Sequence, residues 1–167
     1  ISGGTAAGVS ATAAAVEYAA DNGACVLQNS WGFGAGQISN DSGFENGSTS
    51  VEAQAFLYFM GTKNHPNLEG GIVIFAAGND GKAVAGYPAA WNKLIAVSAI
   101  APDGLPTYYT NYGPGTTISA PGGDQDYYFE YVDDKHNYGE VGCILSTLPY
   151  HVAESGYGYM EGTSMAC

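Results

Sequence analysis

Short, continuous apolar runs separated by a helical pattern constrain the fold more than any other feature of this sequence. The runs "ACVLQNS", "GGIVIFAA" and "NKLIAVSAI" lack polar alternation, which is typical of strands buried in a parallel sheet. In "GVSATAAAVEYAADNG", before the first run, apolar residues recur at helical spacing, and Asn22 and Gly23 supply a helix stop. The alternation predicts an α/β fold with a mostly parallel sheet and helices on both faces.

The remaining segments fit one domain. A second helix is predicted from Thr49 to about Lys63, because Thr49 and Glu52 have the spacing of a capping box. Residues 32–48, rich in Gly and Asn, are predicted to form a loop, and two shorter strands are expected in "TTISAPGG" and "GCILSTLP". Residues 122–142, aromatic and acidic, are interpreted as a surface insertion, with a β-excursion as the alternative.

Charge and hydropathy exclude two classes of partner. Four lysines, no arginine and sixteen acidic residues give a net charge of −12, which disfavours binding to nucleic acid. No apolar run approaches the roughly 20 residues of a membrane span, and the first residues do not resemble a signal peptide. The cysteines Cys25, Cys143 and Cys167 have no close pair, so we expect three buried small hydrophobes and no metal site, with one disulfide left open.

Three stretches carry the chemistry: "NSWG" at residues 29–32, "AAGND" at 76–80 and "GTSMAC" at 162–167. Each lies at a predicted turn or strand end, which is where open α/β sheets bind ligands. Taken singly, each is a weak signal, because a Gly-Thr-Ser tripeptide is more often an ordinary turn and an Asn after Ala-Gly is usually a turn residue. The alternative for Trp31 is a packed aromatic residue at the end of a strand.

In this order and with these spacers, the stretches resemble the subtilisin-like serine peptidases (subtilases, peptidase family S8). The likeness covers nearly the whole chain, since "AVEYAADNGACVLQNSWG", "IVIFAAGNDG", "GYPAAWNKLIAVSAI", "YTNYGPGTTISAPG" and "ILSTLP" also follow the family's order. The resemblance implies an incomplete subtilisin-like fold, with residues 1–167 forming part of a catalytic domain. It also implies a polypeptide substrate and a secreted or periplasmic location.

The resemblance implies a role for each motif. Ser164 would be the nucleophile of a serine endopeptidase that forms an acyl-enzyme, and the Asn79 amide and Ser164 N–H would bind the developing oxyanion. Losing such an asparagine costs about 10²–10³ in turnover, a magnitude measured on a subtilisin itself. Residues implied to bind substrate are Ser30, Trp31, Gly32, Ala76, Ala77, Gly78, Gly86, Tyr87, Pro88 and Thr163. With a glycine and no charged residue there, the first pocket should accept a large uncharged side chain, although Tyr87 and Pro88 could equally be a structural turn.

The family's catalytic aspartate and histidine motifs do not occur in this sequence. His65, His136 and His151 lack the family's context and are interpreted as surface residues. The resemblance places both motifs upstream of Ile1, and it implies that Ser164 opens a helix that continues beyond Cys167. We therefore expect the parent protein to be a peptidase and these 167 residues alone to be inactive.

Three alternatives stay open at this point. The chain could be one piece of a nicked or split peptidase that pairs with the missing upstream part, or a pseudopeptidase that binds peptides without cleaving them. No cofactor is required for the chemistry, but a structural calcium ion is an alternative. The carboxylates of Asp124, Asp126, Asp133 and Asp134 could bind a hard cation, yet they fit no loop signature, so a solvated acidic loop is favoured.

Overall fold

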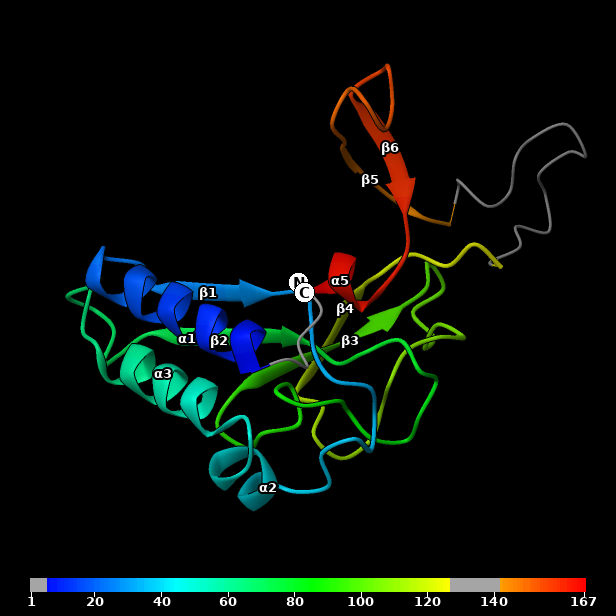
Figure 1. Ribbon diagram of the computed structural model, residues 1–167. Coiled ribbons are helices and arrows are strands. Elements are labelled where there is room, and N and C mark those ends of the chain that lie inside the picture. The colour runs from blue at the N-terminus through cyan, green and yellow to red at the C-terminus, as the bar shows by residue number, and fades with distance from the viewer. Residues whose placement is uncertain (1–5, 127–141) are drawn as a thin grey trace, which may run out of the picture.

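The computed structural model describes residues 6–126 and 142–167. Four parallel strands form its sheet in the order β1-β2-β3-β4 (Figure 1). They are β1 (Val26–Asn29), β2 (Ile72–Ala76), β3 (Ile95–Ile100) and β4 (Ile118–Pro121). Each lies in a segment that the apolar runs predicted, so the mixed α/β class with a parallel sheet is confirmed.

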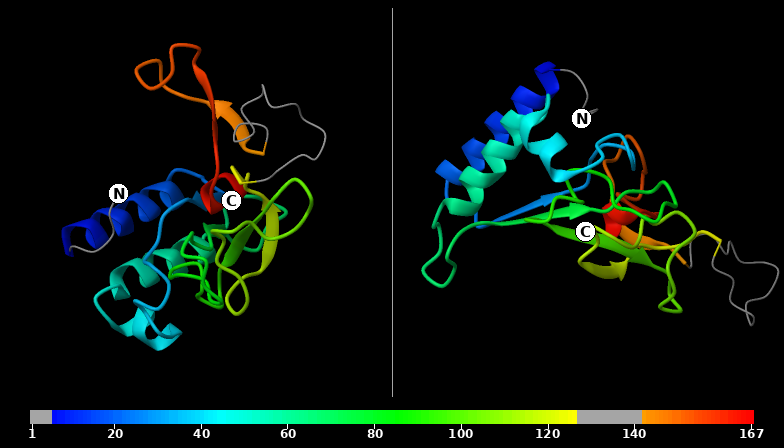
Figure 2. Two further views of the ribbon diagram at one scale, coloured as in Figure 1. Left: turned by 90° about the vertical axis from the view of Figure 1, so that its right-hand side faces the viewer. Right: turned by 90° about the horizontal axis from the view of Figure 1, so that it is seen from below.

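The two long helices lie together on one face of this sheet (Figure 2). Helix α1 (Ala6–Asp21) presents Ala13, Val16 and Ala20 to the core, which is the helical spacing seen in the sequence. Helix α3 (Ser50–Gly61) packs against α1 and β2. Short helix α5 (Thr163–Ala166) contacts β3 and β4.

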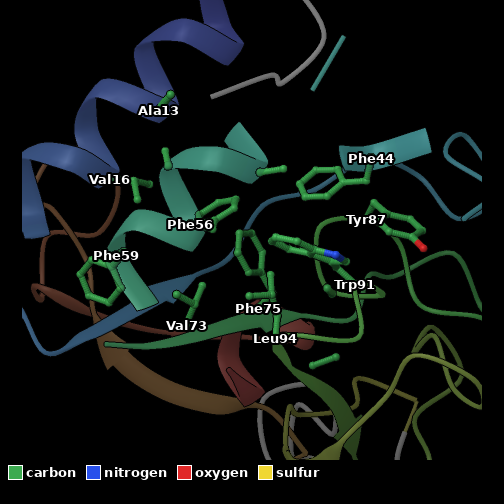
Figure 3. Close-up of a cluster of buried hydrophobic side chains, with 14 of the residues drawn as sticks. Ala13, Val16, Phe44, Phe56, Phe59, Val73, Phe75, Tyr87, Trp91 and Leu94 are labelled. Atoms are coloured by element: carbon green, nitrogen blue, oxygen red, sulfur yellow. The ribbon is translucent and has the colours of Figure 1, made fainter. Parts of the chain in front are cut away.

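The core between these helices and the sheet is rich in aromatic side chains (Figure 3). Phe56 and Phe59 of α3 pack beside Phe75 of β2, and the Phe56 and Phe75 rings meet edge to face at 5.4 Å. Burying such rings accounts for a large share of the apolar area that stabilises a domain of this size.

Residues 32–48 were predicted to be a loop, and this prediction is wrong in one part, because α2 (Asp41–Asn46) forms there. The Asn40 side chain accepts a hydrogen bond from Gly43 N at 2.8 Å and so caps the helix. Phe44 is fully buried against Tyr87 and Trp91, so tertiary packing stabilises a helix too short to form alone (Figure 3).

The capping-box prediction at α3 is also wrong, although the helix begins where expected. Thr49 occupies the N-cap position, but its hydroxyl donates to Phe44 O at 2.7 Å and makes no capping bond. Glu52 is fully buried among the helices instead of reaching back to the cap. The spacing of Thr49 and Glu52 therefore predicted the correct start of the helix, although neither side chain makes a capping bond there.

Three further expectations need correction. Strand β5 (Ile144–Thr147) is not part of the parallel sheet but pairs antiparallel with β6 (Tyr157–Met160). The sequence did not predict β6. The hairpin of β5 and β6 stands away from the main sheet (Figure 1). Strand β1 is an edge strand with Val26 49% exposed, so it is not fully buried. The three cysteines are half-buried, and Cys25 and Cys167 are free thiols.

Candidate active site

A cavity of about 280 Å³ opens at the carboxyl ends of β1 and β2, beside α5. It is lined by residues 30–34, 76–80, 86, 87, 163 and 164, which come from four separate parts of the chain. Every residue predicted to bind substrate lines this cavity except Pro88, which is fully buried. Both Asn79 and Ser164 are in the lining. The structure thus brings the three sequence motifs together.

The first wall of the cavity is residues 30–34, which follow β1. The Phe33 N–H donates to Tyr87 O at 2.7 Å, and the Ser30 hydroxyl donates to Ser164 O at 3.1 Å. A Cβ atom at Gly32 would lie only 2.9 Å from Tyr87 O, so a larger residue would push this wall away from the Tyr87 backbone. Glycine at 32 is therefore required for the wall to pair with residue 87.

Trp31 lines the cavity and is also a packed aromatic residue. Its ring lies 5.0 Å from Phe75 in an edge-to-face arrangement and 6.4 Å from Phe56, while its Nε1–H donates to Asn29 Oδ1 at 3.3 Å. The two interpretations of Trp31 are compatible, because one edge of the ring anchors the wall to the core while the residue still borders the cavity.

The floor of the cavity includes Tyr87. Its hydroxyl donates to Asp41 Oδ1 at 2.6 Å, and its ring packs on Phe44 at 5.5 Å, so α2 supports the floor from below. Burial, followed by the hydrogen bond to Asp41, raises the pKa of the Tyr87 phenol above its ordinary value. The Tyr87-Pro88 peptide bond is cis, and Pro88 is buried behind it. This turn is therefore both structural and part of the pocket.

The second wall follows β2 and carries Asn79. The Asn79 Oδ1 atom accepts two hydrogen bonds from Thr163, one from the backbone N–H at 2.9 Å and one from the hydroxyl at 2.7 Å. Because Oδ1 is held in this way, the Nδ2 amino group points elsewhere with its two N–H donors. Thr163 itself is fully buried, and Gly78 N donates to its hydroxyl at 3.3 Å.

The surroundings of Gly162 indicate which space the Asn79 Nδ2 donors border. A Cβ atom added at Gly162 would lie 3.5 Å from Asn79 Nδ2 and 3.6 Å from Ser164 N, so both groups border one small space. Ser164 lies in the first turn of α5, where backbone N–H groups have no partner within the helix. Two donors beside one space can stabilise an oxygen atom that becomes negatively charged.

Sequence reasoning missed three residues of the lining: Phe33, Gly34 and Asp80. Asp80 corrects the expectation of a pocket without a charged residue. Its Oδ2 atom accepts hydrogen bonds from Ala35 N at 3.1 Å and Asn111 Nδ2 at 3.0 Å, so part of this carboxylate is already engaged by the protein. Phe33 and Gly34 follow the motif "NSWG" and Asp80 ends the motif "AAGND", so their position in the sequence was the available signal.

The lining contains no histidine among the described residues. His65 and His151 are exposed, and the His65 Nδ1 atom accepts a hydrogen bond from Asn67 N at 3.2 Å, while His136 lies outside the described part of the chain. Of the proposed calcium carboxylates, Asp133 and Asp134 also lie outside it. Asp124 is nearly buried and accepts from Asp126 N at 2.9 Å, and the described residues hold no cluster suited to a metal ion.

The open α/β sheet thus has a serine and an asparagine together at its carboxyl edge, and sequence comparison identifies the family. The Subtilase family profile matches residues 2–167, and the chain belongs to that family. It is similar to thermitase of Thermoactinomyces vulgaris, with 30% identity over 93% of this chain and 41% of that protein. It is also similar to the extracellular protease of Xanthomonas campestris pv. campestris, with 36% identity over 58% of this chain and 14% of that protein.

Among solved structures, a lanthipeptide protease has the same fold. It matches 98% of this chain and 48% of its own chain at 21% identity, with a TM-score of 0.66. The present chain spans less than half the length of the curated relatives it matches. None of the helices in the described residues is both long and apolar enough to cross a membrane.

Proposed function

We propose that the complete protein carrying this chain is a serine endopeptidase, with Ser164 as its nucleophile. One observation carries this proposal: Thr163 holds Asn79 Oδ1, while Asn79 Nδ2 and Ser164 N border the same space. In the reaction, Ser164 Oγ attacks a peptide carbonyl and loses its proton to a general base. The carbonyl oxygen becomes an oxyanion beside the two donors, and the acyl-enzyme forms as the amine leaves with a proton.

The general base comes from outside this chain in our proposal. The cavity lining includes no histidine among the described residues, and the curated relatives are all more than twice as long. Strand β1 lies at the edge of the sheet, and no described strand pairs with its other side. An upstream segment with the aspartate and histidine, in the same polypeptide or a separate one, could add a strand there. The 167 residues alone would then be inactive.

The substrate in this proposal is a polypeptide that lies against residues 30–32 and places one side chain in the cavity. The volume of about 280 Å³, with Trp31 and Tyr87 in its lining, suits a large side chain. A secreted or periplasmic location is supported by the relative from Xanthomonas campestris, which is named an extracellular protease.

A fluorophosphonate probe tests this function directly. The complete protein and the 167-residue chain are each treated with the probe, and intact masses are recorded beside those of a Ser164→Ala variant. We expect one adduct on the complete protein and none on the variant or on the chain alone. A complete protein that takes up no probe and cleaves no peptide, yet still binds peptides, would be a pseudopeptidase and would contradict the proposal.

A further inference from the structure

Asn111 is a buried side chain that makes its hydrogen bonds to the wall that carries Asn79. It is fully buried and does not line the cavity. Its Oδ1 atom accepts from Asp80 N at 3.0 Å and Lys82 N at 3.1 Å, and its Nδ2 atom donates to Ala77 O at 3.0 Å and Asp80 Oδ2 at 3.0 Å. Four bonds use the full capacity of a carboxamide.

These bonds bracket Asn79 on both sides along the chain. Ala77 lies two residues before it, and Asp80 and Lys82 follow it. The backbone adds a further link, because Asn111 N donates to Gly78 O at 2.9 Å. Gly78 has a positive φ of 106°, and a Cβ atom there would collide with Asn111 Nδ2. The turn of residues 77–82 therefore takes its shape from direct contact with Asn111.

The loop that contains Asn111 also contacts the chain just before Ser164, whose N–H is the second donor. Asn111 belongs to the loop of residues 107–112 between β3 and β4, and Tyr109 of this loop has its hydroxyl within 2.9 Å of Gly162 N, which donates to it. That hydroxyl lies 2.6 Å from Gly123 O. One loop thus contacts the turn that carries Asn79 and the residue two positions before Ser164, so it can fix their separation.

We propose that Asn111 is a positioning residue that holds the Asn79 amide at the distance from Ser164 N needed to bind the oxyanion. This role rests on the proposed function. Asn111 touches neither the cavity nor the substrate, so it acts through Asn79. Misplacing a donor loses part of what that donor contributes in the transition state and leaves ground-state binding of the substrate nearly unchanged.

The test compares kcat and KM for a chromogenic peptide amide in the complete protein and its variants. We expect Asn111→Ala to lower kcat about 10- to 100-fold and to change KM by less than about 3-fold. Affinity for a peptide aldehyde, whose hemiacetal oxygen would lie between the two donors, should fall by the same factor as kcat. The matched control is Asn64→Ala, because Asn64 Nδ2 also donates to two backbone carbonyls, Ala20 O and Ala24 O, but lies outside the cavity lining. It should leave kcat unchanged.

A second comparison separates positioning from general loss of structure. If Asn111 acts through Asn79, adding Asn111→Ala to Asn79→Ala should lower kcat by less than about 2-fold further. A full 10- to 100-fold further loss in the double variant would overturn the role, as would a parallel rise in KM. If Asn111→Ala does not fold, Asn111→Ser leaves a small uncharged hydroxyl in the buried site and cannot reproduce all four bonds, and the same comparisons apply to it.

The proposed function and the positioning role fail in different ways. A wild-type complete protein without turnover contradicts the function, and the role falls with it. An active wild type whose Asn111 variants keep normal kcat and aldehyde affinity contradicts the role alone.

Discussion

Thr163 holds the Asn79 carboxamide by two hydrogen bonds to a single oxygen atom, from its N–H at 2.9 Å and its hydroxyl at 2.7 Å. The two residues are 84 positions apart in the sequence. Their contact fixes which end of the amide faces the cavity, because an Oδ1 atom bonded to Thr163 leaves Nδ2 for a ligand.

Thr163→Val removes one of these bonds and keeps the side-chain shape. We expect kcat of the complete protein to fall about 5-fold with little change in KM, because one neutral hydrogen bond contributes about 1 kcal/mol. Thr163→Ser keeps the hydroxyl and should stay within about 3-fold of wild type. Steady-state kinetics on a peptide amide checks both variants, and equal kcat values for Thr163→Val and wild type would contradict the role of this hydroxyl.

Gly162→Ala should block the space between the two donors. The new Cβ atom would lie 3.5 Å from Asn79 Nδ2 and 3.6 Å from Ser164 N, where the oxyanion is proposed to lie. We expect kcat and the rate of fluorophosphonate labelling to fall by about 10²–10³, the magnitude of losing an oxyanion donor.

The matched control for Gly162→Ala is Gly36→Ala. Gly36 has a positive φ of 87°, and no atom lies within 4 Å of its added Cβ, so this variant has backbone strain without blocking anything. It should lose stability and keep its labelling rate. Equal labelling losses in both variants would mean that strain alone explains the effect.

Glu52→Gln should remove a pH dependence of stability. Burial raises the pKa of the Glu52 carboxyl from 4.5 to about 7, and the nearby Thr12 hydroxyl opposes this shift only partly. Among the described residues, neither Glu52 carboxylate oxygen has a hydrogen-bond partner. Because the folded pKa is the higher one, the folded state binds the proton more tightly, and stability falls as the pH rises from 4.5 through 7. This group alone lowers the free energy of unfolding by about 3 kcal/mol across that window.

The measurement is urea unfolding between pH 4 and pH 9, in a Ser164→Ala background that prevents self-cleavage. The Glu52→Gln variant should become more stable than its parent above pH 7, with the difference shrinking toward pH 4.5. Glu69→Gln is the control, because the Glu69 side chain is 99% exposed in a surface ion pair with Lys63 and its removal should not depend on pH in this way. A pH-independent difference for Glu52→Gln would contradict the assignment.

Phe44→Ala should destabilise α2, the helix that packs against Tyr87 at the cavity floor. Phe44 is fully buried, and its ring lies 5.5 Å from Tyr87 and 5.3 Å from Trp91. We expect a loss of about 3–5 kcal/mol in the free energy of unfolding, as for other buried phenylalanines. Tyr18→Ala on α1 removes a side chain that is 71% exposed and should cost less than about 0.5 kcal/mol. If Phe44→Ala costs no more free energy of unfolding than Tyr18→Ala, the packing of Phe44 in α2 contributes no stability.

The sequence predicts the parallel sheet well because its strands are apolar enough to identify without knowledge of their neighbours. It does not predict α2, whose stability depends on Phe44 reaching Tyr87 and Trp91 far along the chain. Strand β6 was missed because "YGYM" has two half-exposed tyrosines and a glycine, and no continuous apolar run. The partners of α2 are distant in sequence, whereas β6 pairs with the neighbouring strand β5 and was missed because of its composition.

The candidate site also contains residues that the sequence predicts and residues that it does not. The family resemblance carried by the motifs indicates Asn79 and Ser164, and the structure places both in one cavity. Asn111 carries no such signal, because its partners lie 29 to 34 residues away and become visible only when the turn of residues 77–82 meets the loop of residues 107–112. Asp80 was part of a quoted motif, yet its place in the lining depends on the fold of that turn.

The bond between Asn79 and Thr163 also determines when the site can exist. Between these residues the chain passes through β3, β4, β5 and β6, so the contact closes a long stretch of sequence. A chain still being synthesised contains Asn79 before it contains Thr163 and Ser164. In the proposed function, the oxyanion donors can therefore be assembled only after the chain has been made as far as Ser164 and has folded back onto the turn that carries Asn79.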